Sequence, residues 1–271
     1  MEIQGKVVVV TGAGRGIGAA ICRRMAADGA AAVIVSDRDA AAASDVALQI
    51  GGTAIACDVA VESQIQNMVS DTLNRFGSID VFCSNAGITA KGGLDCSNAD
   101  FQSLWDVNVM SRLYAARAVV PHMIRQGGGS LVHTASAAGL LTEIGSAGYS
   151  ITKHADIALA EWLSVNYGRQ GVRVSCVCPL GVATDMLDQD DPIHRYLQLH
   201  AISAEDVAHA VVDGIRSEQF LILPHPEVAE FFALKAADRD RWLRGMQRML
   251  QKLTRSSERR PGTSTPDRAA A

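Results

Sequence analysis

Short apolar runs alternate with longer amphipathic stretches along most of the chain. Seven runs rich in β-branched residues have the length of strands: residues 6–11, 32–36, 53–56, 79–84, 130–134, 173–177 and 219–223. Stretches of helix length lie between several of them, at residues 16–28, 39–49, 61–76 and 149–168. Strands that are apolar on both faces and alternate with helices form a parallel sheet that is covered on each side. Because such crossovers are right-handed, the pattern predicts an α/β fold with a Rossmann-type, doubly wound, seven-stranded parallel sheet in a single domain, residues 1–225.

Three segments depart from this alternation. Residues 185–202 are polar, contain a proline and lie between a strand and a helix, which predicts a mobile lid. Residues 226–253 predict one amphipathic helix. Its apolar positions, Trp242, Met246, Met249, Leu250 and Leu253, oppose Arg244, Arg248 and Lys252. Such a helix needs a surface to cover, on its own subunit or on a neighbour. Residues 254–271 have no apolar period and are predicted to be a disordered tail.

Composition narrows the class of protein. The chain has 271 residues, 48% hydrophobic, with a net charge of −4, which excludes disorder for most of its length. No apolar run approaches the roughly 18 residues of a membrane span, and the first apolar stretch is too short for a secretory signal. The six cysteines have no CxxC spacing. We therefore expect a cytoplasmic protein with reduced cysteines, no metal site and no membrane partner.

The charge is concentrated at the C-terminal end. Residues 235–271 carry ten basic and four acidic residues, a net of +6, which leaves −10 for residues 1–234. A basic segment can bind nucleic acid, but no groove of interleaved aromatic and basic residues accompanies this one. A solvated helix face is therefore favoured, and no nucleic-acid partner is expected.

The first strand runs directly into a glycine-rich turn, Thr11-Gly12-Ala13-Gly14-Arg15-Gly16-Ile17-Gly18, and a helix follows. Glycines allow a sharp turn and a close approach of pyrophosphate to the backbone. The start of the helix then offers free N–H groups and a partial positive charge to the anion. This strand–turn–helix context predicts a dinucleotide site. The alternative is a tight turn that binds nothing.

The second strand ends in a pair of opposite charges that bears on the choice of dinucleotide. Asp37 follows Gly18 by 19 residues, where a carboxylate can accept hydrogen bonds from the adenosine ribose. It would repel a 2′-phosphate, so NAD is favoured over NADP. Arg38 would hold that phosphate in the alternative case. The alternative for Asp37 is a cap of the next helix, a role that Asp39 fills equally well.

Three polar residues indicate acid–base chemistry. Tyr149 and Lys153 lie one turn apart on a predicted helix, so both project from one face. Ser136 follows the end of the strand at residues 130–134, where the ligand crevice of a doubly wound fold opens. A tyrosine needs its pKa of about 10 lowered to act near neutral pH, and an ammonium at ~4 Å supplies interaction energy of the required size. His133 and His154 are expected to serve packing, because neighbours in a strand or helix point apart.

These motifs resemble the short-chain dehydrogenase/reductase family over about residues 3–225. The family pattern TGxxxGxG matches Thr11, Gly12, Gly16 and Gly18, its acidic residue after the third strand is Asp58, its NAG motif is Asn85-Ala86-Gly87, its helix asparagine is Asn108, its serine is Ser136 and its YxxxK motif is Tyr149 to Lys153. The family's NxxxPG is replaced here by Ser175 to Leu180, while Gly181 to Thr184 still fit.

The resemblance implies an oxidoreductase mechanism and a set of cofactor contacts. Tyr149 would exchange a proton with the substrate oxygen, Ser136 would hydrogen-bond that oxygen, Lys153 would bind the ribose, and Asn108 would hold a water in a proton relay. Together, the implied cofactor-binding residues are Gly12, Arg15, Gly16, Ile17, Gly18, Asp37, Arg38, Asp58, Val59, Asn85, Ala86, Gly87, Tyr149, Lys153, Pro179, Gly181, Val182 and Thr184. Family dimers form through residues 100–126 and 149–168, so a homodimer, or a homotetramer, is expected.

The preferred hypothesis is an NAD-dependent dehydrogenase for a secondary alcohol or its ketone, apolar and of moderate size. Apolar residues near the expected pocket favour such a small-molecule substrate: Leu140, Leu141, Ile144, Met186 and Leu187. Two alternatives stay open. One is an NADPH-dependent ketoreductase that uses Arg38, and the other is a catalytically silent nucleotide-sensing protein.

Overall fold

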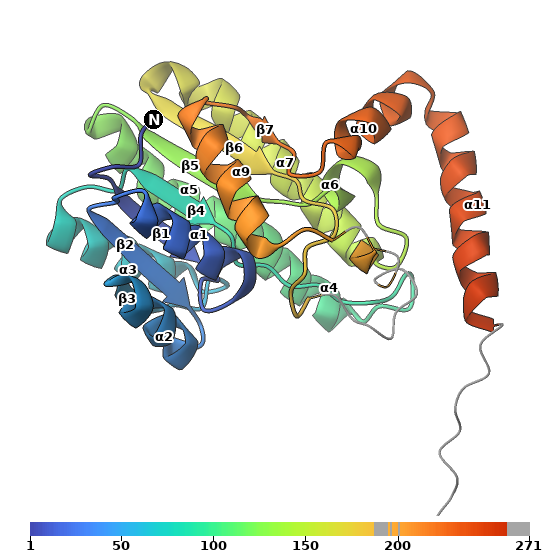
Figure 1. The fold of residues 1–271 in the computed structure, drawn as a ribbon, viewed down its shortest axis with the longest axis horizontal. Helices are drawn as coiled ribbons and strands as arrows, with labels where there is room; N and C mark the ends of the chain where they lie inside the picture. The colour runs from blue at the N-terminus through green and yellow to red at the C-terminus, as the bar shows by residue number, and fades with distance from the viewer. Residues whose placement is uncertain (187–194, 196, 200, 259–271) are drawn as a thin grey trace, which may run out of the picture.

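The computed structural model describes residues 1–186, 195, 197–199 and 201–258. In these ranges seven strands form one parallel sheet in the order β3-β2-β1-β4-β5-β6-β7 (Figure 1). The strands are β1 (Val7–Thr11), β2 (Ala32–Asp37), β3 (Thr53–Ala56), β4 (Val81–Ser84), β5 (Gly129–Thr134), β6 (Val172–Val177) and β7 (Leu221–Ile222). Each strand overlaps its predicted segment, and the doubly wound topology is confirmed.

Helices cover both faces of the sheet. One face carries α1 (Gly16–Ala27), α2 (Ala40–Ile50) and α9 (Ala204–Arg216), and the other carries α3 (Glu62–Phe76), α5 (Ser111–Arg125) and α7 (Ala147–Tyr167). Shorter elements are α4 (Asn98–Trp105), the π-helix η1 (Asp106–Met110), α6 (Ala138–Leu141) and the 3₁₀ turn η2 (Gly168–Gln170). The layers follow from the apolar residues that the sheet presents on both sides.

Strand β1 illustrates how one short sequence builds two cores. Val7 and Val9 belong to the apolar cluster under α3, α5 and α7, whereas Val8 and Val10 belong to the cluster under α1, α2 and α9. Successive side chains of a strand point to opposite faces, so four consecutive valines serve both layers. This is why the central strands show continuous apolar runs rather than alternation.

The sheet reverses its winding between β1 and β4. From β1 the chain builds outward through β2 and β3, and it then crosses to β4, which pairs with the other edge of β1. Connections leave in opposite directions at such a point, so a crevice opens at the carboxyl ends of the strands. The loops after β1, β4, β5 and β6 all meet there.

The C-terminal region differs from the prediction of one helix over residues 226–253. It forms two helices, α10 (Glu227–Ala237) and α11 (Arg239–Glu258), separated by Asp238 in an extended conformation. The Asp238 carboxylate accepts a hydrogen bond from the Arg241 N–H at 2.8 Å and so caps α11. The predicted tail was also placed too early, because α11 continues to Glu258; residues 259–271 lie outside the described ranges.

Most of the predicted lid, residues 185–202, likewise lies outside the described residues. The backbone near its two ends is paired, because the Ala183 N–H donates to the Ile202 carbonyl at 2.9 Å and the Ile202 N–H donates to Gly181 at 3.2 Å. Among the described helices none combines the length and the hydropathy needed to cross a bilayer.

Candidate active site

The glycine-rich turn after β1 is pinned to the end of β4. The Thr11 hydroxyl accepts hydrogen bonds from the backbone N–H groups of Asn85 at 3.0 Å and Ala86 at 3.2 Å. In return the Asn85 amide donates to the carbonyls of Thr11 at 3.0 Å and Gly12 at 3.1 Å. These four bonds close the crevice floor at the point where the sheet reverses its winding.

Glycine is required at two positions of this turn. A Cβ on Gly12, whose φ is +62°, would lie 2.6 Å from the Ala86 Cα, and a Cβ on Gly18 would collide with the Gly12 carbonyl oxygen. No side chain caps the start of α1, so its first N–H groups stay free of a side-chain acceptor. Bare backbone beside an uncapped helix start fits a pyrophosphate, as expected from the sequence.

The carboxylate of Asp37 is held at the edge of the same cavity. It accepts hydrogen bonds from the Gly14 N–H and from the Asp39 N–H, each at 3.0 Å. Asp39 caps α2 by accepting from two N–H groups at 3.1 Å. The cap of α2 is therefore supplied by Asp39, and Asp37 is left facing the cavity beside Arg38.

The expected adenine end of the cavity lies after β3. Asp58 accepts a hydrogen bond from the Ala60 N–H at 3.0 Å and donates its own N–H to Gln64 at 2.8 Å, which fixes the loop. Asp58 and the buried Val59 line the cavity that Asp37 also lines. These carboxylates and the glycine turn together bound a space that fits an adenosine half with its phosphates.

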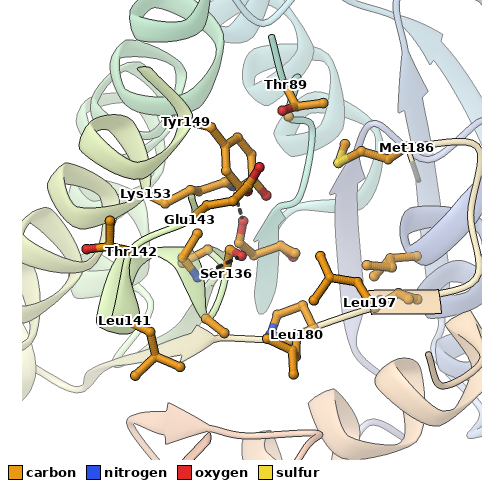
Figure 2. Close-up of a pocket in the computed structure, with 18 of the residues that line it drawn as sticks. Thr89, Ser136, Leu141, Thr142, Glu143, Tyr149, Lys153, Leu180, Met186 and Leu197 are labelled. Atoms are coloured by element: carbon orange, nitrogen blue, oxygen red, sulfur yellow. Dashed lines mark hydrogen bonds between the residues drawn. The ribbon is translucent and has the colours of Figure 1, made fainter. Parts of the chain in front are cut away.

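Ser136, Tyr149 and Lys153 meet at the other end of this cavity (Figure 2). The Ser136 hydroxyl is hydrogen-bonded to the Tyr149 side chain and accepts from the Ala138 N–H at 3.1 Å. The Lys153 ammonium lies 5.6 Å from the centre of the Tyr149 ring. It donates to the Thr134 carbonyl at 2.9 Å. The loop after β5 and one face of α7 thus bring the three predicted residues together.

Electrostatics at this end of the cavity differ from the sequence-based expectation that the Lys153 ammonium lowers the pKa of Tyr149. Burial raises the pKa of the Tyr149 phenol, Glu143 adds to this effect, and the Ser136 hydrogen bond opposes it. Burial and the neighbouring Arg112 lower the pKa of Lys153 to about 8, although Asp156 opposes them. The pKa of Tyr149 is thus raised rather than lowered, and the groups that oppose the rise are Ser136 and Arg112. With a pKa of about 8, the Lys153 ammonium loses its proton in the neutral to mildly alkaline pH range.

Asn108 lies in the π-helix η1 and is fully buried. Its side-chain oxygen accepts from the Ile88 N–H at 2.9 Å, and its amide donates to the Ile88 carbonyl at 2.9 Å and to the Thr152 hydroxyl at 3.1 Å. Asn108 therefore ties the loop after β4 to α7, next to Lys153. A π-helical turn inside a longer helix is frequent at functional sites.

The loop after β6 closes the cavity on the side opposite Tyr149. The Ala137 N–H donates to the Pro179 carbonyl at 2.8 Å, so this loop is joined to the segment that carries Ser136. Of the predicted site residues, all line the cavity except Asn108, Gly18 and Gly181, which act through the backbone or through neighbours. The remaining wall is lined by Leu180, Met186 and Leu197 (Figure 2).

Two features of the site were not found from the sequence. The apolar face of α11, with Trp242, Met246 and Met249, lines the same cavity of about 1270 Å³. Behind Lys153, Arg112 and Asp156 are fully buried. The amphipathic spacing of α11 was visible, but not the surface that it faces, and nothing in the spacing of Arg112 and Asp156 signalled that they meet. Among the described residues no cluster of His, Cys, Asp or Glu has the arrangement of a metal site.

Comparison with known proteins gives consistent results. The family model described as short chain dehydrogenase matches residues 6–193. A zerumbone synthase of Zingiber zerumbet is 36% identical over 195 residues, 68% of this chain and 71% of that protein. A 1-deoxy-11-beta-hydroxypentalenate dehydrogenase of Streptomyces avermitilis is 33% identical over 235 residues, 84% of this chain and 87% of that protein. The crystal structure of a short chain dehydrogenase/reductase from Burkholderia phymatum in complex with NAD superposes with a TM-score of 0.81 at 29% identity, covering 89% of this chain and 96% of that one.

The Thr11 hydroxyl provides a direct test of the crevice floor. Thr11→Val keeps the shape of the side chain but leaves two backbone N–H groups without their acceptor. We expect the free energy of unfolding, measured by urea denaturation, to fall by about 1–3 kcal/mol. Thr11→Ser keeps the hydroxyl and should retain most of the stability. Equal stability of the two variants would contradict the assigned hydrogen bonds.

Proposed function

The chain belongs to the short-chain dehydrogenase/reductase family, and from this premise we propose that it oxidises a secondary alcohol, or reduces the matching ketone, with NAD(H). The observation that carries the proposal is the convergence of Ser136, Tyr149 and Lys153 in one cavity with Asp37 and the glycine turn. A group that moves a proton and a surface that holds a dinucleotide are the two parts this reaction requires.

Each polar side chain at the reacting end is assigned its part in the proposal. Tyr149 takes the hydroxyl proton of the alcohol, or returns it to the ketone oxygen. Ser136 hydrogen-bonds the same oxygen and holds it beside the phenol. Lys153 favours the phenolate by its charge and binds the ribose. The nicotinamide, when bound, accepts or supplies the hydride. Asn108 positions Ile88 and Thr152, and its place in a water relay stays a prediction.

The choice of NAD over NADP rests on Asp37. Its carboxylate is already oriented by two backbone N–H groups, so no reorganisation is needed to receive ribose hydroxyls. A 2′-phosphate at this position would face a fixed negative charge. The neighbouring Arg38 also lines the cavity and favours the alternative, an NADPH-dependent ketoreductase.

The walls of the cavity support an apolar substrate of moderate size. Leu141, Ile144 and Met186 line one part, and the apolar face of α11 lines another. A ligand pocket with mostly apolar walls and a few convergent polar groups orients its ligand through those groups alone. The names of two relatives, a zerumbone synthase and a hydroxypentalenate dehydrogenase, agree with this class.

A homodimer through α7 is part of the proposal. Ile151, Trp162 and Val165 are 48%, 55% and 83% exposed on that helix, and their spacing places them on one stripe. Three large apolar side chains along one helix are typical of a face that another protein surface covers.

Replacement of the phenol tests the reaction itself. In a screen of secondary alcohols that follows NADH absorbance, Tyr149→Phe should lower kcat about 10²- to 10⁴-fold, because the proton acceptor is lost. The affinity for NADH, followed by fluorescence, should change far less than kcat, because the phenol is one of many groups around the dinucleotide. Tyr167→Phe is the matched control on the same helix, where the ring packs against Trp162 instead. A Tyr149→Phe protein with normal turnover would overturn the proposal, and a silent wild-type protein that binds NAD would favour a sensor.

Asp37→Ala tests the choice of dinucleotide. Loss of a charged acceptor should weaken NAD binding by about 10- to 100-fold and bring NADP closer to, or past, NAD in affinity. Asp45→Ala removes the same charge from an exposed position of α2 and should leave both affinities unchanged. If wild-type protein already prefers NADP, the Arg38 alternative holds.

Met246→Glu tests the wall formed by α11. A carboxylate on this face would be desolvated by an apolar substrate, so we expect KM for that substrate to rise about tenfold or more. kcat and the affinity for NAD should stay the same, because the substitution lies away from the proton-transfer groups. Leu243→Glu, on an exposed position of the same helix, is the control. An unchanged KM would remove α11 from the substrate site.

A further inference from the structure

Behind the catalytic end of the cavity lies a cluster of buried charges that packing does not account for. Arg112 of α5, His133 of β5 and Asp156 of α7 have at most 1% of their side-chain surface exposed, and Lys153 has 3%. Burying ions costs several kcal/mol each, and a well-packed apolar replacement is often at least as stable. Such a cluster therefore needs a reason other than stability.

Asp156 is the centre of the cluster. One carboxylate oxygen lies 2.7 Å from His133 Nδ1, and the other lies 3.4 Å from Arg112 Nε and 4.0 Å from Lys153 Nζ. Because a carboxylate can only accept, His133 donates from Nδ1. Its Nε2 has no hydrogen-bond partner among the described residues. The Asp156 carboxylate thus lies between the Arg112 guanidinium and the Lys153 ammonium.

Arg112 links this cluster to the rest of the site. Its guanidinium donates to the Val107 carbonyl and to the Ser111 hydroxyl, each at 2.8 Å, and so holds the π-helix that carries Asn108. It also reaches the Thr134 carbonyl at 3.5 Å, which is the group that accepts from Lys153. Thr134 ends β5, two residues before Ser136. The cluster therefore contacts the supports of the serine, the lysine and the asparagine.

We propose that Arg112, Asp156 and His133 form a positioning network whose balance of charges sets the protonation of Lys153 and directs its ammonium to the Thr134 carbonyl. Asp156 favours the ammonium, Arg112 opposes it, and His133 fixes the orientation of the carboxylate. The contribution of this network to turnover rests on the proposed function, whereas its effect on the charge of Lys153 does not.

The pKa of Lys153 reflects the opposing effects of Arg112 and Asp156. Burial and Arg112 lower the pKa of Lys153 to about 8, whereas Asp156 and the thiols of Cys176 and Cys178 raise it. Burial disfavours the Asp156 carboxylate, yet Arg112 and the His133 hydrogen bond hold its pKa at about 2. Asp156 is therefore ionised throughout the range in which Lys153 titrates, and it acts there as a fixed charge.

The test measures Lys153 directly. The chain has five lysines, Lys6, Lys91, Lys153, Lys235 and Lys252, so protein labelled with ¹³C at lysine Cε gives few signals, and the Lys153→Met variant assigns the relevant one. Asp156→Asn keeps the shape and removes the charge, so the midpoint of the Lys153 titration should fall by about 1 pH unit or more. Arg112→Met should raise it, because the repelling cation is gone.

The decisive variant carries both changes. If charge balance is what matters, Asp156→Asn/Arg112→Met should return the midpoint toward that of the wild-type protein, whereas structural damage from two buried substitutions would accumulate. Glu161→Gln, an exposed acid on the same helix, should leave the midpoint unchanged. Should Arg112→Met not fold, Arg112→Gln carries the same comparison and keeps an amide donor for the Val107 carbonyl.

An unshifted midpoint in Asp156→Asn, or a double variant further from wild type than either single one, would overturn the network. This outcome is distinct from failure of the proposed function, because the titration needs no turnover. A protein without dehydrogenase activity can still show the shifts, and an active one can lack them.

Discussion

The site depends on one constraint, the meeting of parallel strands at a common edge where the winding of the sheet reverses. Residues that follow each of the strands β1 to β6 reach the same cavity although they lie far apart in the chain; Gly12 and Val182, for example, are 170 positions apart. Hydrogen bonds of the Thr11 hydroxyl and the Asn85 amide join the ends of β1 and β4 and fix the relative position of the loops that follow them. They hold the two loops together, so that bare glycine backbone lies beside an uncapped helix start.

At the end of the cavity that holds Ser136, Tyr149 and Lys153, burial has two opposing effects. A phenol loses its proton less readily when buried, yet burial is needed to exclude water from the reaction. A nearby ammonium resolves the conflict only if it keeps its own proton, and burial works against that as well. The carboxylate of Asp156 counters both the burial of Lys153 and the repulsion from Arg112. The charge of Lys153 at the cavity surface thus depends on the buried Arg112 and Asp156, which lie on the side of the sheet covered by α5 and α7.

The sequence predicted the parts of this molecule that local patterns determine. Runs of β-branched residues gave all seven strands, and the glycine turn, Asp37 and the Tyr149–Lys153 pair were found because short spacings place them. Features that depend on tertiary contacts were not visible. His133 and Asp156 are 23 residues apart and meet only through the packing of β5 against α7. His133 was predicted to serve packing; it does lie in the core, but it does so with a charged partner. The break at Asp238 had a local signal, an aspartate able to cap a helix, which the continuous apolar spacing around it concealed.

The C-terminal helices show how a peripheral element becomes part of the site. The buried Lys235 of α10 donates to the Leu140 carbonyl at 2.5 Å, which anchors α10 to α6, the turn that directly follows Ser136. The ring centres of Phe231 and Trp242 lie 6.5 Å apart across the break at Asp238. At this break α11 turns away from α10 (Figure 1). The apolar face of α11 lines the cavity that Ser136 and Tyr149 also line, and α11 does not lie against the sheet (Figure 1). The short helix α6 therefore contacts both Ser136, through the Ala138 N–H, and α10, through the Leu140 carbonyl, so the positions of Ser136 and of the α10 end of the cavity wall depend on the same element.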